Sequence, residues 1–147
     1  MKRITLFIMV MKIYWLKILS NEGLTIHALG DIKGGDILES ILTSVKKLLG
    51  IAEEYEQFDT DIIMHINSVF MILRQLGVGP SEGFSINDKN SKWTDFLDDD
   101  ITLESVKSYV YLKVRLLFDP PTSGVVMEAT NRMINELEWR INACIDK

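Results

Sequence analysis

Cysteine and histidine are both scarce in this sequence of 147 residues. Cys144 stands alone, which excludes an internal disulfide, a cysteine zinc cluster and a CxxC redox pair, and favours a reducing compartment. His27 lies in a glycine-rich stretch and His65 at the edge of an apolar helical face, far apart along the chain. We therefore expect no metal site.

Motifs with catalytic or phosphate-binding chemistry are also missing. The sequence has no Gly-rich phosphate loop, no HExxH pair and no nucleophile elbow. Carboxylates occur throughout, but no pair stands apart from the solvated helix faces. We therefore expect a protein that is not an enzyme and that binds no cofactor.

Basic charge is in deficit. The chain has 16 lysines and arginines against 21 aspartates and glutamates, a net charge of −5 and a pI near 5.0. A general nucleic-acid binder needs a basic surface, so any DNA contact is expected to be local. The hydrophobic content of 47% is ordinary for a globular protein, and the length fits one domain.

No apolar run reaches the roughly twenty residues needed to cross a bilayer. Met1 to Leu19 comes nearest and carries only basic charges, but Lys12 and Lys17 interrupt it. Its start imitates a secretory signal, yet no small-residue cleavage site follows. We therefore expect no membrane partner.

Residues 1–35 are predicted to be an atypical apolar extension. Met9 and Met11 offer later starts, so the first residues are either a mis-assigned beginning or part of the extension. Ser20 to Gly35 contains four glycines and is typical of a loosely ordered connector.

The rest of the chain is organised around the stretch from Thr102 to Pro121. Apolar residues cover two adjoining sides of this predicted helix, which indicates a central helix with neighbours packed on both flanks. The two final prolines end it. Its polar strip is expected at Glu104, Ser108, Tyr111 and Arg115.

Three further helices are predicted from apolar residues repeating at helical spacing. They run from Asp36 to Leu49, with Lys46 on the outer face; from a cap at Asp59 or Thr60 to Leu76; and from a cap at Thr122 or Ser123 nearly to the C-terminus. Gly50 and Gly77 are the expected left-handed stops of the first two. The prediction is an all-α domain of four principal helices over residues 36–147.

Between Gly77 and Asp100 the helical period disappears, which predicts a long loop or a short β excursion between the second and third helices. A short strand is expected at Phe84 to Ile86, followed by the aromatic pair Trp93 and Phe96. These side chains either tuck the connection onto the core or reach a neighbouring molecule. Asp98 to Asp100 are expected to interact with the dipole of the next helix.

Three large apolar side chains fall on the outer faces of their predicted helices. Met64 and Met71 are two turns apart, and Trp139 projects among polar residues of the last helix beside Arg140. Such residues suit a subunit contact. The alternatives are tolerated surface methionines, and an indole lying over the stems of long neighbours.

Four segments carry a family resemblance in their joint order and spacing. Together they resemble the small head-tail connector proteins of tailed bacteriophages and prophages, over the chain from about Asp36 to the C-terminus. The segments are DTDIIMHINSVFMILRQLGVGP (Asp59 to Pro80), GFSINDKNSKWTDFL (Gly83 to Leu97), VKSYVYLKVRLLFDPP (Val106 to Pro121) and ELEWRIN (Glu136 to Asn142). The apolar start departs from the pattern.

The resemblance implies an α-helical subunit of a ring beneath the portal protein, at the head-tail junction of the virion. Such a ring assembles in the host cytoplasm, extends the DNA channel, touches the passing DNA only passively and receives the next head-completion or tail protein. A ring subunit needs two different, complementary flanks. The candidate subunit or portal interface comprises Met64, Met71, Phe84, Trp93, Trp139 and Arg140.

Two other classes remain open. A small helical regulator would bind a partner helix in a groove and show a small fixed stoichiometry without affinity for a portal. A membrane-associated protein would use the apolar basic segment Met1 to Leu19, and deletion of that segment would abolish lipid binding.

Overall fold

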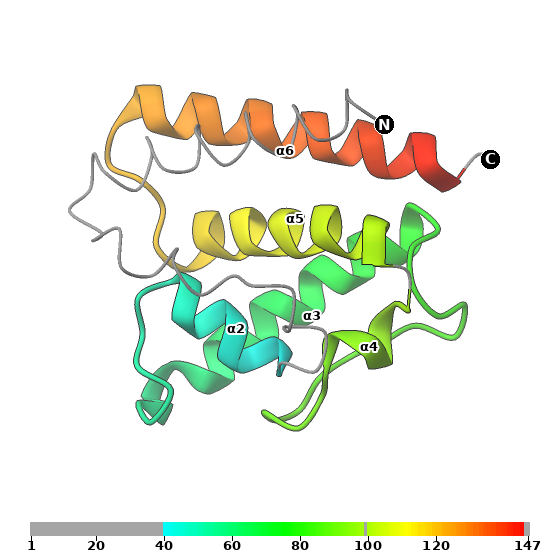
Figure 1. Ribbon diagram of the computed structural model, residues 1–147. Helices are drawn as coiled ribbons and strands as arrows, with labels where there is room; N and C mark the ends of the chain where they lie inside the picture. Colours follow the sequence, from blue (N-terminus) through cyan, green and yellow to red (C-terminus); the bar gives the residue numbers. More distant parts are fainter. Residues whose placement is uncertain (1–39, 99, 146–147) are drawn as a thin grey trace. The chain divides into compact units, whose positions relative to one another are not determined.

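The computed structural model describes residues 40–98 and 100–145 (Figure 1). Over these residues the fold is all-α, as predicted, and the predictions for residues 1–35 lie outside this part of the chain. The helices are α2 (Ile41–Leu48), the 3-10 helix η3 (Glu56–Phe58), α3 (Asp59–Gln75), α4 (Trp93–Phe96), α5 (Asp100–Phe118) and α6 (Gly124–Ile145). Four are the principal helices expected from the sequence, and α4 is a single additional turn.

Helix α5 is central. It packs against α3 on one side and α6 on the other, while α2 packs on α3 (Figure 1). Tyr109 of α5 donates its hydroxyl hydrogen to Oε2 of Glu138 in α6 at 3.2 Å, which ties these two helices together. The prediction of neighbours on both flanks is confirmed. The buried side chains of α5 include Leu103, Val106, Tyr109, Val110, Leu112 and Val114.

The polar strip predicted for α5 is wrong in its second half. Tyr111 and Arg115 are buried, with 2% and 7% of their surface exposed, and Nη1 of Arg115 donates to the Tyr111 hydroxyl at 3.0 Å. The strip reaches solvent only nearer the start of the helix, where Glu104 is exposed. A guanidinium tolerates this position because a neighbouring hydroxyl accepts its hydrogen bond.

Lys46 of α2 is also buried, although the pattern places it on the outer face. Its Nζ lies 2.6 Å from Oδ1 of Asp59 and donates to the carbonyl of Glu53 at 2.8 Å. The aliphatic stem fills interior space while the charge is compensated, and burial of a lysine requires such compensation. This pair joins α2 to the first residue of α3.

The predicted helix ends are mostly met, with shifts of a few residues. Gly50 and Gly77 have φ of 76° and 81°, which is the left-handed conformation expected after α2 and α3. Helix α2 begins at Ile41, where Ser40 is extended (ψ 134°) and its hydroxyl accepts from the Thr43 N–H. The predicted start at Asp36 lies outside the described residues. Ser123 takes the N-cap position of α6, where its carbonyl accepts from the Met127 N–H.

The connection between α3 and α5 is fastened to the core at three places. Asn67 of α3 holds Ile86 by two hydrogen bonds of 2.8 and 2.9 Å, one to its N–H and one to its carbonyl. The ring of Phe84 packs edge-on to Phe70, with centroids 5.3 Å apart. Ile41 donates its N–H to the Ser91 carbonyl. Residues 84–86 form no strand, and the one isolated bridge in the described residues pairs Ser40 with Lys92.

Candidate subunit interface

Helix α3 presents an apolar stripe to solvent. Met64 and Met71 have 55% and 66% of their surface exposed and lie two helical turns apart, about 10.5 Å along the axis. They stand opposite the buried face of the helix, which comprises Ile62, Ile66, Val69, Phe70 and Leu73. A shallow hollow of about 280 Å³ adjoins the second methionine and is lined by Met71, Arg74 and Gln75.

Helix α6 presents a different outer face, with Trp139 at its centre. The indole is 68% exposed and stands opposite the buried face of Thr130, Met133, Ile134, Leu137 and Ile141. The charges around it are paired within the helix, Arg132 with Glu128 at 2.5 Å and Arg140 with Glu136 at 2.8 Å. Both pairs join residues four positions apart, which are neighbours on a helix surface, and they leave an aromatic side chain among compensated charges.

The two outer faces lie on helices that flank α5. Helix α3 packs on one side of α5 and α6 on the other, and each outer face is turned away from the buried face of its own helix (Figure 1). Met64 and Met71 are therefore on one flank of the helical unit and Trp139 is on the other. The sequence predicts that these residues are exposed, and the packing of α3 and α6 on α5 places them on two different flanks.

The remaining candidate residues have internal roles in this structure. Trp93 is 1% exposed, and its Nε1 donates to the Ser44 hydroxyl at 2.9 Å. Phe84 is half-buried in the aromatic cluster against Phe70 and Phe96. Both aromatic side chains therefore pack the connection between α3 and α5 onto the core, which was one of the two predicted possibilities.

A second exposed patch was not singled out from the sequence. Tyr55, Phe58 and Leu117 are 41%, 39% and 53% exposed. The Phe58 ring lies 5.3 Å from that of Tyr55 and 5.4 Å from that of Phe118, which joins η3 to the end of α5. In the sequence, the only signal for this patch is the presence of Tyr55 and Phe58 in an acidic turn. Leu117 gives no signal, because the helical pattern assigns it to an apolar face.

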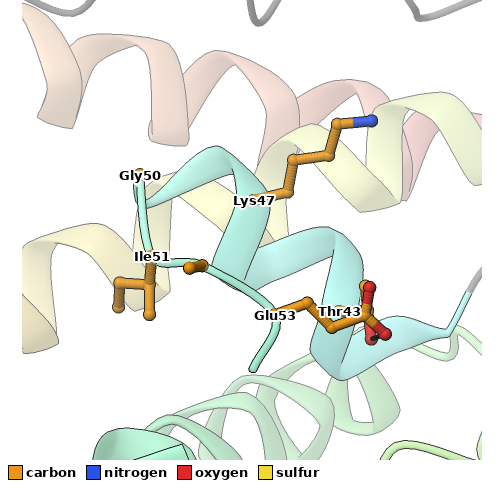
Figure 2. A pocket seen from close by; sticks show the side chains of 6 residues that line it. Thr43, Lys47, Gly50, Ile51 and Glu53 are labelled. Carbon is orange, nitrogen blue, oxygen red and sulfur yellow. Dashed lines mark hydrogen bonds between the residues drawn. The ribbon is translucent and has the colours of Figure 1, made fainter. Parts of the chain in front are cut away.

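Another hollow, beside the end of α2, offers no convergent chemistry. It measures about 390 Å³ and is lined by Thr43, Lys47, Gly50, Ile51, Ala52 and Glu53. Figure 2 shows Thr43 beside Glu53, 3.5 Å apart at their oxygens, while Lys47 points away from both. Among residues 40–98 and 100–145, no group of three or more histidine, cysteine or acidic side chains is placed to hold a metal ion. None of the helices described is long and apolar enough to span a membrane.

Comparison with known protein families identifies the class of this chain. A family model described as phage connector protein matches residues 41–147, more than half of the chain. The chain therefore belongs to this family, and the predicted membership among phage head-tail connectors is confirmed. No curated protein and no solved structure matches the chain.

Proposed function

We propose that this connector forms a ring beneath the portal protein, extends the DNA channel and joins the phage head to the next head-completion or tail protein. It acts at the head-tail junction of the virion, after assembly in the host cytoplasm. DNA passes along the ring without being held, which suits a chain of net charge −5.

The observation that carries the proposal is the opposition of two unlike apolar flanks. A closed ring uses heterologous contacts, in which one patch of a subunit meets a different patch of the next. Met64 and Met71 on α3 and Trp139 on α6 are exposed on opposite sides of α5. Exposed large apolar side chains of this kind are typical of protein contacts.

A ring subunit also needs surfaces toward the proteins above and below it. The patch of Tyr55, Phe58 and Leu117 suits this task, because it lies where α3 begins and α5 ends. It therefore involves residues other than those on the outer faces of α3 and α6. Contact with the portal or with the following protein through this patch leaves both flanks available.

The experiment is light scattering after size exclusion, on the full-length chain alone and mixed with the portal protein encoded beside it. A large complex in which several copies co-elute with the portal is expected. A chain that stays monomeric and never shifts the portal peak would remove the main support for the ring. A small fixed stoichiometry with another protein would favour the helical regulator instead.

A further inference from the structure

We propose that the indole of Trp139 inserts into the hollow lined by Met71, Arg74 and Gln75 on α3 of the neighbouring copy. This inference rests on the proposed ring and names the contact that repeats around it. The occupant of the hollow is a second copy of this chain, and the entering group is one side chain.

The size of the hollow favours one side chain over a small molecule. Its volume of about 280 Å³ stands at the lower limit of the roughly 300–1,000 Å³ of ligand pockets. The described residues that line it, Met71, Arg74 and Gln75, come from consecutive turns of one exposed helix face. A flat, rigid ring fills such a hollow with little loss of conformational entropy.

The chemistry of the lining matches an indole. The thioether of Met71 makes favourable contacts with aromatic rings, and the methionine chain adapts to the shape of its partner. The guanidinium of Arg74 can stack on an indole face, the strongest aromatic partner for a cation. Among the described residues, no carboxylate lies within ion-pair distance of Arg74. Gln75 supplies an amide oxygen for the indole N–H.

The surroundings of Trp139 suit burial in a contact. Glu128 and Arg132 form one ion pair on this face, and Glu136 and Arg140 form another. Charges that already have partners reduce the cost of excluding water around the ring. The indole stands 68% exposed between these pairs, as a central anchor with a polar rim.

The placement makes the contact repeat. In one copy, the Trp139 indole is on α6 and the hollow beside Met71 is on α3, on the other side of α5. A copy therefore cannot fill its own hollow. Each added copy fills one hollow and brings another. Such a contact continues until the chain of copies closes, whereas a twofold contact would stop at a pair.

Variants at both ends of the contact test it on the portal. Trp139→Asp and Met71→Asp replace exposed side chains, so both should fold, which circular dichroism and thermal unfolding check. Each is expected to weaken portal-templated assembly by roughly tenfold or more, measured as copies per portal against protein concentration. Trp139→Phe keeps an aromatic side chain and Met71→Leu keeps an apolar lining, so both variants should retain most of the assembly. Val125→Asp is the matched control, because it places the same charge on an exposed residue of α6, two heptads away.

The outcomes separate this inference from the proposed function. Failure of the natural chain to collect on the portal would count against the ring itself. Normal assembly of the natural chain together with Trp139→Asp or Met71→Asp would overturn the contact and leave the ring standing. An equal loss with Val125→Asp would also overturn it, since the contact would then not be centred on Trp139.

Discussion

The two tryptophans in the described part of the chain have opposite environments. Trp93 is 1% exposed, lies beside Phe70 and donates to Ser44, whereas Trp139 is 68% exposed on the outer face of α6. Both stand among polar residues in the sequence, in KWTD and LEWR. Among the described residues, the fold provides a hydrogen-bond acceptor for the first indole and none for the second. Trp93 thus stabilises the monomer, and Trp139 is available to another molecule.

The largest expected effect is the difference in unfolding free energy between removal of one indole and removal of the other. Trp93→Ala should lower the free energy of unfolding by about 3–5 kcal/mol, because it leaves a cavity among packed aromatic rings. Trp139→Ala should change it by no more than about 0.5 kcal/mol, as for most surface substitutions. Urea unfolding followed by circular dichroism measures both. Similar losses in the two variants would contradict the division of roles.

A smaller effect tests the hydrogen bond that holds Trp93. Ser44→Ala leaves the buried Nε1 hydrogen without its acceptor and should cost about 1–3 kcal/mol of unfolding free energy. Ser68 is the matched control, since its hydroxyl likewise donates to a carbonyl of the preceding turn but is exposed. Ser68→Ala should stay within about 0.5 kcal/mol of the natural chain. Equal effects would show that the indole bond contributes nothing.

The smallest effect concerns how firmly α6, and with it Trp139, is held on α5. Burial, and then the neighbouring Glu138 carboxylate, raise the pKa of Tyr109 well above its usual value. Above about pH 10 the unfolded chain releases this proton while the folded chain keeps it, so this contribution to stability is lost as pH rises.

Unfolding measured across alkaline pH should therefore be less steep for Tyr109→Phe than for the natural chain. Glu138→Gln removes one of the causes and should give an intermediate slope. Identical slopes in all three proteins would mean that this hydroxyl does not link α5 to α6.

Helix existence and order could be predicted from sequence because apolar residues recur at helical spacing and glycine or proline marks the ends. The stops at Gly50 and Gly77 and the prolines after α5 depend on local backbone conformation alone. The outward positions of Met64, Met71 and Trp139 followed from the same periodicity.

Apart from the buried pair of Tyr111 and Arg115 within α5, the errors occurred where a polar group finds a partner far away in the sequence. Lys46 reads as a surface residue until Asp59 is brought beside it. Asn67 also fits an outer face, and its two hydrogen bonds to Ile86 exist only once the connection folds back. The burial of Trp93 likewise depends on a hydrogen bond to Ser44, which lies far away in the sequence. The opposition of the two flanks likewise required knowledge of which helices pack on α5.

Cross-linking on the portal tests most directly whether unlike flanks meet. The chain would carry Ser68→Cys on α3 and Ala143→Cys on α6, in a background where the exposed Cys144 is replaced by serine. A short bifunctional thiol reagent should then give a ladder of covalent products that extends to many copies, while either cysteine alone gives no ladder. Products that stop at a dimer, or linkage of α6 to α6, would contradict the account.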